Sequence, residues 1–246
     1  IELPSYTDEE KLHIAVDYLL PKQKKANGIA PAALRVDEGA LQTVIARYTR
    51  ESGVRSLERE IGRLCRKAAM AFATTDVKRI AITAENVEGY LGTPRYTRDE
   101  AAKTDLVGVV NGLAWTQVGG EILPVEVGVM DGSGKLELTG NLGEVMQESC
   151  KAAMSCLRQR AAELGIPTDF YKTKDIHIHF PEGAVPKDGP SAGIAITTAL
   201  LSALTDRPVR HDVAMTGEVT LRGRVMPIGG LREKTMGALR AGIRTV

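Results

Sequence analysis

The strongest constraint on the fold is a change of sequence pattern near residue 95. Up to Leu91, apolar residues recur at the three- and four-residue spacing of amphipathic helices. Beyond Gly92-Thr93-Pro94 and a charged stretch to about Asp105, short apolar runs alternate with glycine turns, a pattern typical of strands. The change predicts two domains, residues 1–95 and 96–246, and an α+β fold class in which the first domain is helical.

The first domain is expected to hold four helices and one short strand. Thr7 and Glu10 form the pattern of a capping box that opens a helix over residues 11–20, and Pro21 is expected to close it. The predicted elements are helices over 11–20, 36–50, 56–73 and between Thr83 and Leu91, with a strand over 77–82. Within the longest helix the residues at helical spacing are Leu57, Ile61, Leu64 and Ala68.

The second domain is expected to be a mixed α/β unit. Alternation between 175 and 180 places Ile176, Ile178 and Phe180 on one face of a strand. His177 and His179 then lie on the other face. The predicted strands cover 106–110, 112–118, 121–129, 135–139, 175–180 and 213–216, followed by a hairpin over 219–225. The predicted helices cover 143–164, 194–204 and 231–241.

Composition excludes several classes of protein. With 43% hydrophobic residues, 26% charged residues and a formal net charge of +1, the chain shows no global attraction to nucleic acid or an anionic membrane. No apolar run is long enough to cross a bilayer, and no secretion signal stands at the N-terminus. The three cysteines lack metal-ligand spacing, so we expect no metal site and a reducing, cytoplasmic setting. The absent start methionine and the strand-like residues 242–246 suggest a fragment.

One serine stands in an informative context, in Pro186-Lys187-Asp188-Gly189-Pro190-Ser191-Ala192-Gly193. The stretch places Ser191 between a rigid proline and glycine turn and an apolar helix. The N-terminus of a helix offers unpaired N–H groups and a partial positive charge, which suit an oxyanion or a phosphate. Ser191 can therefore be a nucleophile, a simple N-cap or a phosphate ligand.

A serine hydroxyl becomes a good nucleophile only when a base takes its proton. None of the four histidines stands in a triad motif, although spacing alone does not exclude one. Residues 189–193 match the Gly-x-Ser-x-Gly pattern. The nucleophile elbow, however, needs a strand that runs directly into the turn, and residues 181–188 are expected to form a loop.

Lysine is the other available base. An ordinary lysine has a pKa of about 10.4, and complete burial lowers it by about 3 to 5 units. Lys234 follows the Gly229-Gly230 turn at the start of a predicted helix, where the helix dipole also disfavours an ammonium. Lys187 is the rival base, but a lysine in a Pro-Lys-Asp loop is expected to stay solvated.

Three segments together resemble the bacterial Lon ATP-dependent proteases: the Ser191 stretch, Met215-Thr216-Gly217-Glu218 and Gly229-Gly230-Leu231-Arg232-Glu233-Lys234. Residues 112–115, 140–149 and 181–184 match as well, and residues 48–60 resemble the small helical subdomain of the family's AAA+ ATPase module. The resemblance covers nearly the whole chain. It implies a helical AAA+ lid subdomain and a C-terminally truncated Lon-type protease domain with the ribosomal protein S5 domain 2-like fold.

The resemblance implies a Ser-Lys dyad with Ser191 as the nucleophile and Lys234 as the general base. Arg232 stands where some relatives have a lysine, and because arginine stays protonated this favours Lys234. The resemblance further implies that Thr216 supports the lysine by a hydrogen bond. Backbone N–H groups near Ser191 would stabilise the oxyanion, and Arg55 matches the residue that senses nucleotide.

Two further candidates have alternative interpretations. Asp188 is expected either to orient the serine loop or to be a plain turn residue. His177 is expected either to line the site or to belong to a polar face of the sheet. Trp115 can contact substrate, but a lone tryptophan in a strand usually packs.

The expected function is that of the serine endopeptidase domain of an ATP-dependent protease that degrades unfolded or damaged proteins in quality control and the stress response. The full-length protein would use ATP and Mg²⁺ and form a homohexamer. The chain itself lacks the Walker motifs and would need no cofactor for its chemistry. Binding to a membrane is not expected, and basic residues on the helix over 56–73 leave nucleic acid open. The alternatives are a phosphate-binding, small-molecule kinase-like domain and a non-enzymatic assembly module.

Overall fold

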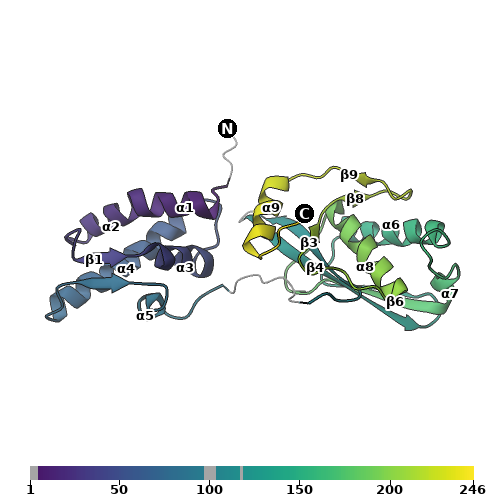
Figure 1. Ribbon diagram of the computed structural model, residues 1–246, viewed down its shortest axis with the longest axis horizontal. Helices are drawn as coiled ribbons and strands as arrows, with labels where there is room; N and C mark the ends of the chain where they lie inside the picture. The colour runs from purple at the N-terminus through teal and green to yellow at the C-terminus, as the bar shows by residue number, and fades with distance from the viewer. Residues whose placement is uncertain (1–4, 97–103, 117–118) are drawn as a thin grey trace. The chain divides into compact units, whose positions relative to one another are not determined.

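The computed structural model describes residues 5–96, 104–116 and 119–246. Contacts divide the chain into two compact units, one within residues 1–98 and the other comprising residues 99–116 and 120–246. Figure 1 shows helices dominating the first unit and a sheet with helices in the second. Val118, the predicted end of one strand, and most of the predicted linker lie outside the described residues. No helix in the described ranges is long and apolar enough to cross a membrane.

The first unit packs its helices around one apolar core. The predicted residues Leu57, Ile61, Leu64 and Ala68 are all completely buried, which confirms the helical spacing. Strands β1 and β2 pair in parallel. The elements are α1 (Asp8–Ile14), a π-helical turn (Ala15–Leu19), α2 (Leu20–Ala26), β1 (Leu34–Val36), α3 (Glu38–Tyr48), α4 (Arg55–Thr74), β2 (Ile80–Ile82) and α5 (Val87–Leu91).

Two predictions for the first unit are wrong, although the capping box of Thr7 and Glu10 is confirmed. Pro21 does not end the first helix, because α1, the π-helical turn and α2 follow one another without a break and Pro21 lies in α2 directly after the π-helical turn. Val36 belongs to β1 and not to the following helix. That helix begins after its N-cap Asp37, whose side chain accepts a hydrogen bond of 2.7 Å from the Ala40 N–H.

The second unit is built on a five-stranded sheet with the order β5-β6-β4-β3-β7. Its strands are β3 (Val109–Thr116), β4 (Gly119–Asp131), β5 (Leu136–Thr139), β6 (Lys174–His179) and β7 (Ala214–Met215). β6 runs antiparallel to β4 and parallel to β5, and β3 runs parallel to β7. The expected mixed pairing is therefore present. The prediction of separate strands over 106–110 and 112–118 is wrong, because Val109–Thr116 form one continuous strand, β3.

Helices cover both faces of this sheet. They are α6 (Glu144–Arg160), α7 (Phe170–Thr173), α8 (Gly193–Thr205) and α9 (Leu231–Arg240), with a hairpin of β8 (Glu218–Val219) and β9 (Val225–Met226) between the last two. α6 and α8 share a core with Ile176, Ile178 and Phe180, the face predicted by alternation.

Strand β3 separates α8 from α9. Gly112 faces Ala195 of α8, with 3.4 Å between the Ala195 Cβ and an ideal Cβ on the glycine. The next residue, Leu113, packs with Ala238 of α9. Because successive residues of a strand point to opposite faces, α8 and α9 lie on opposite faces of the sheet. Ser191 precedes α8 and Lys234 belongs to α9, so the two candidates approach from different faces.

Candidate active site

Ser191 lies in a short 3₁₀ turn, Pro190–Ala192, immediately before α8. Gly189 turns the chain into it with φ of 120°, a conformation that favours glycine. The Ser191 carbonyl accepts hydrogen bonds from the Gly217 N–H at 2.7 Å and from Thr216 Oγ1 at 3.3 Å. The N-cap of α8 is Ala192, so the interpretation of Ser191 as a simple N-cap is wrong.

The loop before Ser191 is joined to the start of α6 by Asp188. Asp188 Oδ1 accepts hydrogen bonds from the N–H groups of Met146 and Gly189, both at 2.9 Å. Met146 is in the first turn of α6, so Asp188 caps that helix from a distant part of the sequence. Gly143 makes room for the contact, because a Cβ there would lie 2.3 Å from Asp188 Cγ.

Lys187 is not the solvated side chain that the loop pattern predicts. Its ammonium donates hydrogen bonds to the carbonyls of Glu182 at 2.7 Å, Val185 at 3.0 Å and Gly140 at 3.4 Å. Partial burial lowers the pKa of Lys187. Backbone carbonyls therefore hold its amine in the loop, and the pocket around Ser191 is lined by other residues.

Lys234 is buried, with only 3% of its surface exposed. It lies in the first turns of α9, which starts after Gly230 in the left-handed conformation (φ 69°). Its Nζ donates a hydrogen bond of 3.1 Å to Thr216 Oγ1. Burial lowers the pKa of Lys234 from its ordinary value of 10.5, since a charged ammonium loses its hydration there. The neutral amine is therefore more accessible here than for a lysine in solvent.

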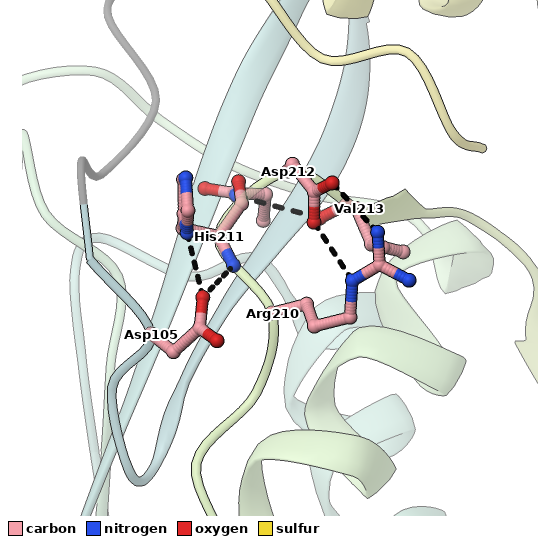
Figure 2. A network of polar contacts seen from close by, with 6 residues as sticks. Asp105, Arg210, His211, Asp212 and Val213 are labelled. Atoms are coloured by element: carbon pink, nitrogen blue, oxygen red, sulfur yellow. Dashed lines mark hydrogen bonds and ion pairs between the residues drawn. The ribbon is translucent and has the colours of Figure 1, made fainter.

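Thr216 follows β7, and a polar network fixes the segment leading into that strand. Asp105 Oδ1 lies 2.6 Å from the ring Nδ1 of His211 and accepts its backbone N–H at 3.0 Å, and Figure 2 shows the two residues facing each other. Asn111, buried on β3, donates a hydrogen bond of 2.9 Å to the His211 carbonyl. Asn111 also pairs with Ala214 in the parallel ladder of β3 and β7. The position of Thr216 is thus set by the sheet.

Ser191, Lys234 and Asp188 line one pocket of about 620 Å³. It lies around the end of β3, which contributes Leu113, Ala114 and Trp115 to its lining. Polar and apolar groups contribute about equally to its lining, and the acidic residues among them are Asp188, Glu218 and Glu233. The other lining residues are Leu113, Ala114, Trp115, Leu123, Met146, Pro190, Glu218, Pro227, Ile228, Gly229, Gly230 and Glu233.

Trp115 does not pack in the core, contrary to the usual behaviour of a lone tryptophan in a strand. Trp115 is 60% exposed and lies beside Gly230. A Cβ added to Gly230 would be 3.1 Å from the Cβ of Trp115. Sequence reasoning missed Leu123, Met146 and Ile228 as part of the pocket. They come from β4, α6 and the loop before α9, so no local pattern links them.

His177 lies away from this pocket, on β6. Its Nε2 is 2.8 Å from Thr139 Oγ1, and the same hydroxyl is 2.7 Å from Nδ1 of His179. These contacts belong to the polar face of the sheet, which was the second interpretation of His177.

No group of His, Cys, Asp and Glu within the described residues is able to hold a metal ion.

Arg55 is the first residue of α4 in the other unit, and its side chain is exposed. The N–H groups that follow it, of Ser56 and Leu57, donate hydrogen bonds of 2.9 and 2.8 Å to the carboxylate of Glu51. The Glu51 carboxylate therefore occupies these N–H groups, while the Arg55 side chain is exposed at the start of the helix.

A serine hydroxyl and a buried lysine amine that line one pocket are typical of serine hydrolases that use an amine as the base. Comparison with known proteins is more specific. Residues 81–246 match the Lon protease (S16) C-terminal proteolytic domain, and residues 25–80 match the Lon protease AAA+ ATPase lid domain. The chain belongs to the Lon protease family and comprises its lid and proteolytic domains. The AAA+ lid indicates ATP use in the family.

Three relatives illustrate the similarity. Over 246 residues the chain is 56% identical to the Lon protease of Finegoldia magna, 55% to that of Geobacter metallireducens and 56% to Lon protease 2 of Thermus thermophilus. Each match covers 100% of this chain but only 32%, 30% and 31% of the respective relative. The chain thus spans about a third of the length of these relatives.

The match to the proteolytic domain begins within the first structural unit. Residues 80–91 include β2 and α5, and Ile82, Val87 and Leu91 are buried in the core formed with α3 and α4. By packing, these residues therefore belong with the lid.

Proposed function

We propose that this chain carries the peptide-cleaving site of an ATP-dependent serine endopeptidase, with Ser191 as the nucleophile and Lys234 as the general base. The observation that supports it best is the environment of the lysine. Its amine is buried, bonded to Thr216 Oγ1 at 3.1 Å, and lines the same pocket as Ser191. Burial lowers the pKa of Lys234, and its neutral form can accept a proton from a serine hydroxyl.

The reaction proceeds by acyl transfer. Ser191 Oγ attacks the carbonyl carbon of a peptide bond while its proton moves to Lys234 Nζ. The resulting ammonium returns a proton to the leaving amine, and the C–N bond breaks to give an acyl-enzyme. Lys234 then takes a proton from water, whose oxygen attacks the ester carbonyl. As the ester C–O bond breaks, the Lys234 ammonium gives this proton to Ser191 Oγ, and the carboxylic acid is released.

Backbone N–H groups stabilise the oxyanion in this proposal. The Gly193 N–H donates to the Pro190 carbonyl, and the Ile194 N–H donates to the Gly217 carbonyl at 3.0 Å. The N–H groups of Ser191 and Ala192, at the start of the 3₁₀ turn, are the candidates that remain. Thr216 holds the lysine, and Asp188 keeps the serine loop on α6.

The wider setting belongs to the same proposal. The lid would occupy residues 1–95 and the proteolytic domain residues 96–246. Arg55 would contact the phosphates of ATP bound with Mg²⁺ by the full-length protein, in which six copies form a ring that delivers unfolded proteins. A cytoplasmic location is supported by the cysteines, which are free and buried. A kinase-like domain and a mere assembly module have no support in the family matches.

Peptide cleavage tests the dyad. A peptide boronate is expected to react with Ser191, and Ser191→Ala and Lys234→Ala are each expected to reduce cleavage of a fluorogenic peptide by about 10⁴-fold or more. Circular dichroism should show an unchanged fold. Lys151→Ala, on the exposed surface of α6, is the control and should cleave normally. Undiminished hydrolysis by Lys234→Ala would remove the lysine from the mechanism.

A further inference from the structure

We propose that Gly120 and Gly237 position the catalytic lysine, because they let the backbone of α9 lie directly against β4. The inference rests on the proposed role of Lys234 as the base. Neither glycine touches the reacting atoms, so both act through the helix that carries the lysine. We call this contact the glycine seat.

The β4 side of the seat is formed by Gly120. A Cβ at this position would lie 1.8 Å from the carbonyl oxygen of Glu233 and 2.8 Å from the backbone nitrogen of Lys234. Real Cβ atoms do not approach backbone atoms so closely, and backbone cannot move aside as a flexible side chain can. Any side chain at residue 120 would therefore push away the very turn of α9 that holds the lysine.

The α9 side of the seat is formed by Gly237. A Cβ here would lie 2.5 Å from the Gly120 carbonyl carbon and 2.9 Å from the Glu121 nitrogen. One turn separates Gly237 from Lys234, so the two residues lie on neighbouring positions of the same helix. The two glycines thus fit each other, and both are needed for the close approach.

A hydrogen bond fastens the contact. Arg240, also on α9, donates a hydrogen bond of 2.5 Å to the Gly120 carbonyl. A glycine in the middle of a helix ordinarily destabilises it relative to alanine. Gly237 therefore makes α9 itself less stable than alanine would, and the close packing of α9 on β4 explains why a glycine stands there.

The seat controls where the amine of Lys234 lies. The bond from Lys234 Nζ to Thr216 Oγ1 is 3.1 Å, near the upper end of the normal range, so a small outward shift of α9 would break it. The same shift would admit water to a side chain that is now 3% exposed. The lysine would then bind its proton more tightly and reach the Ser191 hydroxyl less well.

Kinetics of the glycine variants test the inference. Gly120→Ala and Gly237→Ala are each expected to lower kcat for a short peptide by about a hundredfold, the typical cost of displacing a catalytic group by about 1 Å. KM should change little, because the residues that bind the peptide remain. The acidic limb of the pH–rate profile should move to higher pH as Lys234 regains hydration.

The matched control is Gly128→Ala on the same strand. An added Cβ at Gly128 meets nothing within 4 Å, so this variant is expected to keep the kcat and the pH profile of the parent. If both seat variants fail to fold, Arg240→Ala loosens the seat without adding an atom and should show the same upward shift of the acidic limb.

Lys234→Ala in the same assay separates the two proposals. If Lys234→Ala is inactive but Gly120→Ala keeps the parent's kcat and pH profile, the glycine seat is wrong and the dyad stands. If Lys234→Ala remains active, the dyad itself fails. A loss of thermal stability in Gly237→Ala with kcat and pH profile unchanged would also overturn the inference, because the glycine would then serve packing alone.

Discussion

At the scale of single residues, the protonation of Lys234 governs the proposed chemistry. Burial lowers its pKa from the ordinary 10.5, and only the neutral amine accepts the Ser191 proton. The neutral fraction grows as the pH rises through the lowered pKa. Peptide cleavage is therefore expected to increase with pH along a limb that lies below pH 10.5.

A charge-conserving variant isolates this effect. Lys234→Arg keeps a positive charge and a hydrogen-bond donor, but a guanidinium does not release its proton in this range. The variant is expected to be inactive at every pH at which the parent remains folded. Activity in Lys234→Arg with the parent's pH profile would show that another group sets the limb.

Thr216 contributes at the same scale through its hydroxyl. It accepts the hydrogen bond from Lys234 and donates one to the Ser191 carbonyl, so it links the two members of the dyad. Thr216→Val keeps the shape and loses both bonds. Since a hydrogen bond contributes about 1 kcal/mol, kcat is expected to fall about five- to tenfold with KM unchanged. Thr216→Ser, which keeps the hydroxyl, should stay close to the parent, and equal losses in both variants would contradict this role.

At the scale of elements, α6 supports the serine loop through a cap from outside the helix. Asp188→Ala would leave the N–H groups of Met146 and Gly189 without their acceptor. The free energy of unfolding, measured with urea, is expected to drop by about 1 kcal/mol. Reaction of Ser191 with the boronate should slow as the loop loosens. Asp188→Asn retains an acceptor oxygen and should lose less than Asp188→Ala; the reverse order would exclude the capping role.

Elements with a clear period or a local cap could be predicted from the sequence. Three such features depend only on residues close by in the sequence: the capping box of Thr7 and Glu10, the buried stripe of α4 and the alternation in β6. Predictions failed where distant contacts decide. β1 is three residues long and exists through its pairing with β2, and Pro21 is tolerated because a π-helical turn precedes it.

In the candidate site, too, the residues in distinctive local segments could be predicted and those defined by distant contacts could not. Ser191 and Lys234 stand in distinctive segments, and the structure brings both to one pocket. Lys187 was expected in solvent because a sequence does not show that three carbonyls from two loops converge on its amine. The glycine seat was equally hidden, since Gly120 and Gly237 acquire their meaning only when α9 docks on β4.

At the scale of the whole molecule, apolar packing is divided between the two units. α3 and α4 share one buried cluster, whereas the sheet shares others with α6, α8 and α9. The described residues of each cluster come from a single unit. Each unit thus has the internal core that independent folding requires. The chain should unfold in two steps rather than one.

Scanning calorimetry of two leucine variants tests this division. Leu64 and Leu157 are 0% and 1% exposed, one in each unit, and each replacement by alanine is expected to cost about 2–5 kcal/mol through lost contacts and a cavity. Leu64→Ala should lower only the transition of the lid, leaving the reaction of Ser191 with a boronate intact. Leu157→Ala should lower the temperature of only the second unit's transition, and it should also slow the reaction of Ser191 with the boronate. A single transition that both variants shift equally would show that the two units unfold as one cooperative body.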